Sequence, residues 1–126
     1  MLFRSRAADG HYLITETTFK THAACGMTHD TIDNLLQLQR EYALEATAID
    51  RVDIEVPRVH LRVCNIQNPT TGLQVKFSLR AVAALTLLRG DTTDIGTYTD
   101  ALAARPDLVA LRDRVTVTAQ IGRAHV

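Results

Sequence analysis

The sequence is poor in aromatic residues and carries no net charge. Only 5% of its 126 residues are Phe, Tyr or Trp, tryptophan is absent, and fourteen basic residues balance fourteen acidic ones. A protein that binds single-stranded nucleic acid needs aromatic rings for base stacking and a basic track for the phosphates. The composition therefore gives no indication of a nucleic-acid partner.

Long apolar runs and cysteines are also scarce. No stretch approaches the roughly 20 apolar residues that a membrane-spanning helix needs, and the first ten residues lack the apolar centre of a secretory signal. Two cysteines, Cys25 and Cys64, form at most one disulfide, far below the density of secreted disulfide scaffolds. With 46% apolar residues the chain can build one packed domain. These features predict a domain that works in the reducing cytoplasm with both thiols free.

Apolar periodicity predicts the strands. Residues 12–19 are rich in β-branched and aromatic residues, and a short strand is expected there. Val52, Ile54 and Val56 alternate with acidic residues, which is typical of a strand with one buried face. Residues 115–119 repeat this alternation and predict a closing strand. Pro57 follows the second of these segments, and a bulge, sheet edge or turn is expected at that residue.

Helical signals separate these strands. Thr28 precedes an apolar periodicity that predicts a helix over residues 29–45, with Thr28 as its N-cap. Ser78 is the expected N-cap of a second helix that is apolar almost all round, with Gly90 at its C′ position. A short helix is expected within 91–104, and Pro106 should begin another. The pattern predicts an α+β domain, a single small unit with helices packed on one face of a short sheet.

Residues 19–33, FKTHAACGMTHDTID, carry the densest chemistry in the chain. A helix that begins near Thr28 would point its free N–H groups towards a loop that holds Lys20, Cys25, Gly26 and His29, an arrangement that favours a bound anion such as a carboxylate or phosphate. A purely structural interpretation is also open. Thr28 and Asp30 would then cap the helix, Lys20 and His29 would be solvated, and Cys25 would be a small buried apolar residue.

Metal binding is a further alternative in this region. His22, Cys25 and His29, together with His60 and Cys64, supply nitrogen and sulfur ligands of the kind that zinc takes. The HxxCxxxH spacing has no paired second half, and it matches known zinc modules poorly. We therefore predict no metal site. The same reasoning favours capping over nucleophilic catalysis for Ser78, since no GxSxG-type elbow surrounds it.

Two separated segments together resemble one family. The FKTHAACGMTHDTID segment is similar to a lysine-containing loop and TH-initiated helix of the MmgE/PrpD proteins, and PTTGLQVKFSLRAVAALTLLRG is similar to their P-T-x-x-E-A-K-F-S-L segment. The RVDIEV strand lies between the two, and ALRDRVTV follows them in the expected order. This family includes 2-methylcitrate dehydratases and cis-aconitate decarboxylases. The resemblance spans residues 12–119 and corresponds to the smaller, C-terminal domain of such a protein.

The resemblance implies a cofactor-free lyase that acts on small polycarboxylates in a cleft between a helical and an α+β domain. It implies Lys20 and His29 as catalytic residues, and Lys20, Cys25, Gly26 and Lys76 as substrate-binding residues. The cis-aconitate decarboxylases have histidine at the position of Cys25, which disfavours decarboxylation, and Gln74 replaces a common glutamate. Elimination of water, as in 2-methylcitrate dehydratase, is the leading expectation. A dicarboxylate epimerase or isomerase and a non-catalytic binding domain of the same fold are the alternatives.

The resemblance also sets expectations for partners and chain ends. The expected partners are a polycarboxylate substrate, an N-terminal helical domain of the same chain and a second subunit in a full-length homodimer, whereas no nucleic acid or membrane is expected. Residues 1–11 are interpreted as a frayed lead-in and 12–119 as the domain. Residues 120–126 are interpreted as a non-native tail, because a common sequencing-adapter sequence encodes the final hexapeptide, IGRAHV.

Overall fold

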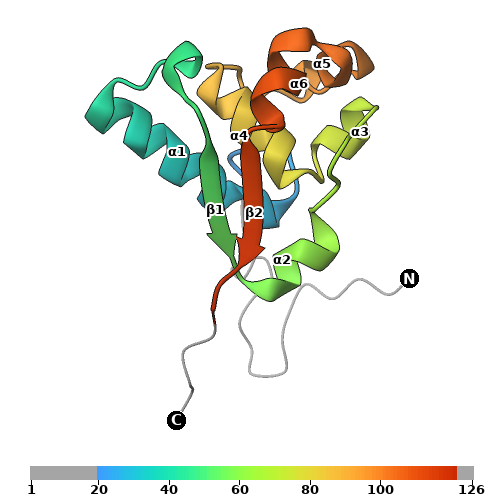
Figure 1. The fold of residues 1–126 in the computed structure, drawn as a ribbon. Helices are drawn as coiled ribbons and strands as arrows, with labels where there is room; N and C mark the ends of the chain where they lie inside the picture. Colours follow the sequence, from blue (N-terminus) through green and yellow to red (C-terminus); the bar gives the residue numbers. More distant parts are fainter. Residues whose placement is uncertain (1–19, 122–126) are drawn as a thin grey trace, which may run out of the picture.

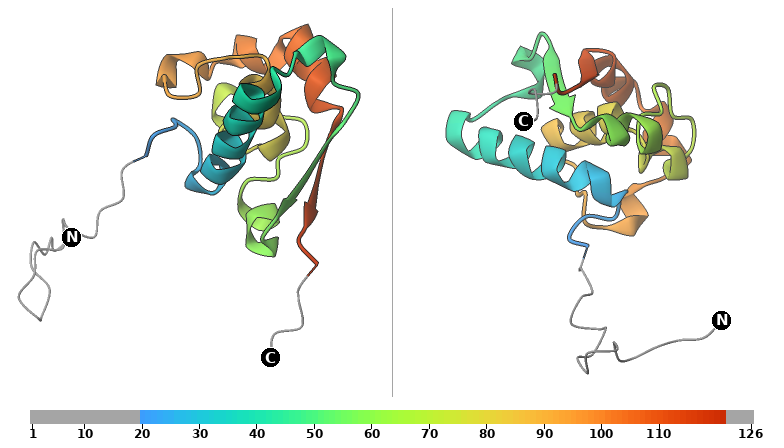
Figure 2. Two further views of the ribbon diagram at one scale, coloured as in Figure 1. Left: turned by 90° about the vertical axis from the view of Figure 1, so that its left-hand side faces the viewer. Right: turned by 90° about the horizontal axis from the view of Figure 1, so that it is seen from below.

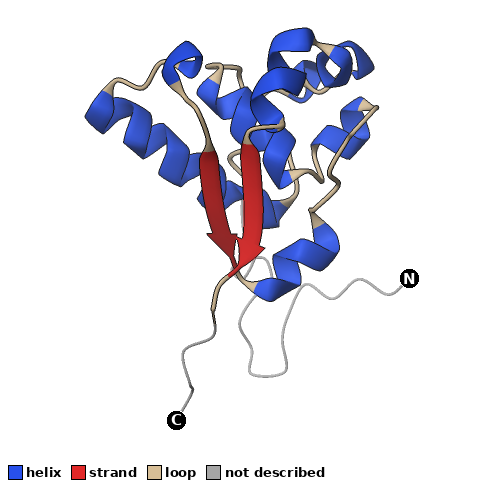
Figure 3. Cartoon of the chain, viewed as in Figure 1, coloured by secondary structure: helices blue, strands red, loops and turns tan. Residues whose placement is uncertain are grey.

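A computed structural model of the chain describes residues 20–121. The predicted lead-in, the predicted strand over 12–19 and the last five residues lie outside the described residues. Within 20–121 the elements follow in the order α1 (His29–Tyr42), β1 (Val52–Val56), α2 (Arg58–Val63), α3 (Gly72–Val75), α4 (Leu79–Leu87), α5 (Asp100–Ala104), α6 (Pro106–Arg112) and β2 (Val115–Ala119). Of three 3₁₀ turns, η2 (Gly26–Thr28) precedes α1, η3 (Ala46–Ala48) lies between α1 and β1, and η4 (Ile95–Thr97) lies between α4 and α5. This is the expected α+β class (Figures 1 and 3).

The two strands form a parallel pair whose alternation is in phase. Val52 lies opposite Val115 and Ile54 opposite Val117, so the apolar side chains share one face. The intervening polar residues are exposed, namely Asp53, Glu55, Thr116 and Thr118. Seen from below, α1 and α4 lie on the same side of the sheet (Figure 2, right). The prediction of helices on one face of a short sheet is therefore confirmed. Parallel strands need a long connection, and here residues 57–114 supply it.

Helix α4 is the centre of the core. Leu79 and all residues from Ala81 to Leu87 are buried, as the apolar sequence of this helix predicts. The Ser78 side chain accepts a hydrogen bond from the Ala81 amide at 3.1 Å, which confirms the cap. Gly90 was expected at C′, but Arg89 takes that left-handed position, with φ of 62°. The amide of Gly90 instead donates to the Leu85 carbonyl at 2.9 Å, which completes a Schellman motif. A Cβ on Gly90 would overlap the Leu85 side chain.

Helix α1 buries only its first half. Ile32 and Leu35 are buried, but Leu38 is 41% exposed and Tyr42 68% exposed, so the apolar face predicted for the whole helix ends early. The helix also stops at Tyr42 rather than near residue 45. Ala43 has φ of 49° and ψ of 47°, a left-handed conformation that ends the helix.

The region after β1 contains two short helices that the sequence pattern did not indicate. Pro57 ends β1 and stands at the N-cap of α2, which confirms a turn at this residue. Val59, Leu61 and Val63 alternate with polar residues as a strand would, but they lie on this helix, and Val59 and Val63 are both more than 40% exposed. Helix α3 begins at Gly72, at the end of a polar stretch, residues 65–72, whose Asn68-Pro69 pair and glycine are typical of a loop. A Cβ at Gly72 would overlap the Tyr98 carbonyl, so only glycine permits this close approach.

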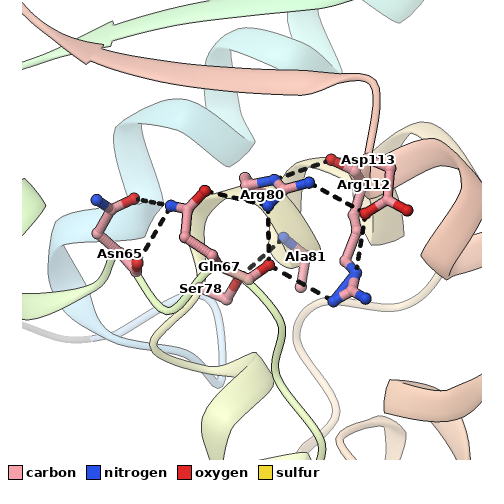
Figure 4. A network of polar contacts seen from close by, with 7 residues as sticks. All are labelled: Asn65, Gln67, Ser78, Arg80, Ala81, Arg112 and Asp113. Atoms are coloured by element: carbon pink, nitrogen blue, oxygen red, sulfur yellow. Dashed lines mark hydrogen bonds and ion pairs between the residues drawn. The ribbon is translucent and has the colours of Figure 1, made fainter.

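A polar network fastens the start of α4 to the segment between α6 and β2 (Figure 4). The Arg80 guanidinium donates to the Arg112 carbonyl at 3.1 Å, to the Gln67 carbonyl at 3.1 Å and to the Asp113 carboxylate at 3.1 Å. The planar fork of arginine suits several acceptors at once. Arg80 thus joins three segments that are far apart in the sequence. No helix in the described part of the chain is long and apolar enough to cross a membrane.

Candidate functional site

The loop before α1 is fixed by backbone contacts to two distant segments. The Ala23 amide donates to the Thr92 carbonyl at 2.9 Å, and the Cys25 amide donates to the Lys76 carbonyl at 3.0 Å. The side view shows this start of the described chain on the side of the helices away from the sheet (Figure 2, left). The predicted site loop and Lys76 are therefore adjacent, although about half the chain separates them.

The entry into α1 differs from the expected cap. Thr28 has helical dihedral angles, and its side chain caps no amide. Its hydroxyl instead donates to the Cys25 carbonyl at 2.6 Å, because η2 precedes the helix without a break. This turn uses the amides of Thr28 and His29, so the positive end of the helix dipole moves towards Gly26. Gly26 is exposed, and the space where its Cβ would stand is open.

Lys20 and His29 converge on one carbonyl group. The Lys20 ammonium donates to the Ala24 carbonyl at 3.5 Å, and His29 Nε2 lies 3.4 Å from the same oxygen. Lys20 is exposed and His29 is half-buried. Both contacts are long, which leaves the ammonium and the imidazole available to a second acceptor. The two residues predicted as catalytic thus lie together at the start of α1.

Lys76 reaches the same region through Tyr98. Its ammonium lies 5.5 Å from the centroid of the Tyr98 ring, within the range of a cation–π contact. The Tyr98 hydroxyl donates to the Thr92 carbonyl at 2.8 Å, and burial, followed by the nearby Asp91 charge, raises the pKa of Tyr98 to about 12. Tyr98 therefore stays neutral. Its ring contacts the Lys76 ammonium, and its hydroxyl bonds to the same Thr92 carbonyl that accepts from the Ala23 amide.

The two cysteines pack together in a small apolar cluster. Cys25 is half-buried and packs against a small core cluster formed by Val56, Cys64 and Leu79. Burial, and next the adjacent Cys25 thiol, raise the pKa of Cys64 to about 12, so Cys64 remains a neutral thiol. Its Sγ donates to the His60 carbonyl at 3.3 Å. Across residues 20–121, no three His, Cys, Asp or Glu side chains gather closely enough to hold a metal ion.

His22 contacts the predicted site residue His29, although its sequence position suggested only a metal ligand. The ring is 5% exposed, and both of its nitrogens have partners: Nδ1 lies 2.7 Å from Thr92 Oγ1, and Nε2 lies 2.7 Å from Asp33 Oδ1. Its ring meets that of His29 edge to face, with 5.1 Å between the centroids. The contact with Thr92 spans 70 residues of sequence, so no local pattern could have revealed it.

Comparison with known protein families identifies the domain. The model of the MmgE/PrpD C-terminal domain matches residues 22–121, most of the chain. The chain belongs to the MmgE/PrpD family. The match includes Cys25, Gly26, His29 and Lys76, whereas Lys20 lies just before it. No curated protein matches the chain significantly.

This MmgE/PrpD domain brings together cationic and hydrogen-bonding groups suited to an anion. Lys20, Lys76 and the open backbone at Gly26 supply positive charge or partial positive charge, and His29 can give or take a proton. A separate groove of about 570 Å³ lies between α1 and β1, but none of the predicted site residues lines it. The predicted site residues therefore lie in and around the loop before α1 and do not line that groove.

Proposed function

We propose that this domain supplies the cationic half of a polycarboxylate site in a cofactor-free lyase that eliminates water from a hydroxy tricarboxylate such as 2-methylcitrate. The observation that carries this proposal is the convergence of Lys20 and His29 on the Ala24 carbonyl, beside Gly26 at the start of α1. Family membership supports the class of protein.

Elimination of water beside a carboxylate requires three things of a site. A base removes the proton α to the carboxylate, an acid protonates the leaving hydroxyl, and fixed cations stabilise the enediolate-like charge that develops. In this proposal Lys20 binds a substrate carboxylate and stabilises that charge. His29 acts as an acid–base or hydrogen-bonding group, while Gly26 and Lys76 contact the substrate.

Residues 20–121 do not supply a complete acid–base set under this proposal. We therefore propose that the remaining groups come from the helical domain characteristic of the family. The 126-residue chain alone should show no turnover of 2-methylcitrate, whereas a chain that also carries the helical domain should be active.

The decisive variant is Lys20→Met in that two-domain chain. Methionine retains much of the side-chain volume but removes the charge, so kcat/KM for 2-methylcitrate should fall by roughly a hundredfold or more. His29→Gln should also reduce activity. Arg40→Met is the matched control, because it removes an exposed cation near the far end of α1. Near-normal kcat/KM in Lys20→Met, or turnover by the 126-residue chain alone, would refute the proposal.

A further inference from the structure

His22 is a buried ring held on both sides by side chains from other segments. Thr92 lies in the segment after α4, and Asp33 lies on α1. Buried polar atoms need partners, and here two 2.7 Å contacts satisfy both ring nitrogens. The Asp33 side chain is 60% exposed, so it forms this contact from the surface.

The two partners fix the ring whatever its protonation state. An ionised carboxylate only accepts, so Nε2 carries a hydrogen and donates it to Asp33. The Thr92 hydroxyl donates to Nδ1 when the ring is neutral and accepts from it when the ring is charged. Only the hydroxyl hydrogen has to rotate between these states. The orientation of His22 is thus defined by Asp33 and Thr92.

This fixed ring supports His29. The two rings meet at 87°, an edge-to-face contact in which the orientation of one limits the orientation of the other. The polar contact that the described structure gives His29 is the 3.4 Å approach to the Ala24 carbonyl, which is too long to fix a ring alone. His29 therefore takes its orientation largely from His22.

We infer that His22 is a positioning residue, which is held by Asp33 and Thr92 and which sets the orientation of His29 in the anion site. The geometric part of this inference is independent of the reaction, whereas its use in binding a polycarboxylate rests on the proposed function. If His22 had a purely structural role, loss of its contacts would change only the stability of the domain. A positioning role should change the His29 ring and the affinity for an anion while the fold persists.

Asp33 offers the cleanest perturbation, because its exposed side chain can be altered without opening the core. Asp33→Ala removes the acceptor for His22 Nε2, whereas Asp33→Asn keeps an acceptor oxygen and should restore the contact. Asp30→Ala is the matched control, since Asp30 is an exposed acidic residue in the first turn of α1, three residues before Asp33. Circular dichroism of all three variants checks that the fold is retained.

The first measurement is NMR of the histidine rings in the 126-residue chain without ligand. Asp33→Ala should weaken the nuclear Overhauser effects between the His22 and His29 ring protons and shift the His29 ring signals. Asp33→Asn and Asp30→Ala should resemble the wild type. Unchanged His29 signals in Asp33→Ala would overturn the inference. Thr92→Val tests the other nitrogen of His22 in the same way, and an unchanged His29 ring there would count equally against it.

The second measurement is the citrate affinity of the two-domain chain carrying each of these variants, and here the sign of the change distinguishes two explanations. Removing a negative charge near an anion site should strengthen binding if only electrostatics matters, and Asp30→Ala measures that effect. Loss of positioning should instead weaken binding in Asp33→Ala by about tenfold, with recovery in Asp33→Asn. Equal or tighter binding by Asp33→Ala would overturn the role in the site. If the wild type binds no citrate, the proposed function fails, while the ring signals still decide the positioning role.

Discussion

Replacing Arg80 by methionine should destabilise the domain by about 2–4 kcal/mol, a large share of the roughly 5–15 kcal/mol typical of a domain. The Arg80 side chain is 13% exposed and donates to the carbonyls of Arg112 and Gln67 and to the Asp113 carboxylate. Each bond from a charged donor contributes about 1.5–3 kcal/mol, but these contributions are not additive. Arg112 also reaches the Gln67 carbonyl at 3.5 Å, so one acceptor retains a partner and the loss stays below the sum.

Urea unfolding followed by circular dichroism measures this loss, with an unchanged m-value as the sign that two-state unfolding persists. Arg80→Lys keeps the charge but loses the planar fork, so an intermediate loss is expected. Arg51→Met is the control. Arg51 makes two hydrogen bonds of 2.9 and 2.7 Å to Asp53, but its side chain is 74% exposed, and its removal should leave the midpoint within error. If Arg80→Met behaved like Arg51→Met, burial would not be the factor that gives the network its energy.

Three further predictions test the strand phase, a helix end and a buried thiol. Ile54→Asp should lower the free energy of unfolding by about 3 kcal/mol or more, because Ile54 packs against both the main core around α4 and the small cluster of Val56, Cys64 and Leu79. Asp53→Ala should leave the urea midpoint nearly unchanged, and equal losses in the two variants would contradict the strand phase. Ala43→Gly should stabilise the domain by about 0.5–1 kcal/mol and raise its melting temperature, because glycine adopts the left-handed conformation of this residue without strain. Ala110→Gly inside α6 should lower the melting temperature, and a lower melting temperature in both variants would refute the argument. Folding raises the pKa of Cys64 from 9.0 to about 12, so the thiol ionises first in the unfolded state and the free energy of unfolding should fall as the pH rises from 9 to 12. Cys64→Ala should show a smaller fall in this range, and a pH profile identical to that of the wild type would exclude the Cys64 thiol as its cause.

The elements predicted correctly are those in which periodicity and burial agree. In β1, Val52, Ile54 and Val56 alternate with acidic residues and do face the helices. In α4, a serine cap and a run of good helix formers coincide with burial of every residue except Arg80. Pro106 begins α6 because its fixed φ suits the first turn and its missing N–H is not needed there.

Helix α2 shows why periodicity failed elsewhere. Six residues are too short for alternation to distinguish a strand from a helix, and Val59 and Val63 are largely exposed, so burial did not shape their spacing. Tertiary contacts decide the conformation. The Cys64 carbonyl accepts from the Leu79 amide at 2.9 Å, and a helical turn after Pro57 brings the chain to that position.

The candidate site was predictable in its residue types but not in its connections. Lys20 and His29 were identified because basic groups near a helix start suit an anion, and Lys76 was identified from the family resemblance. The contacts that join them run through His22 and Thr92, 70 residues apart, and their partners emerge only when the chain is folded. A histidine two residues after Lys20 is by itself an ordinary polar residue.

The exposure of the site gives a physical reason for proposing a second domain over it. Lys20 and Gly26 are exposed, and surface ion pairs in water contribute only about 0–1 kcal/mol because solvent screens them. The same cations would act far more strongly on a carboxylate once another surface excluded water from them. The loop itself needs no such help to stay in place, since Ala23, Cys25 and His22 are bonded to segments that lie far away in the sequence. We therefore expect the isolated chain to hold these groups in position but to bind anions weakly, and a covering helical domain to increase the affinity without changing the loop.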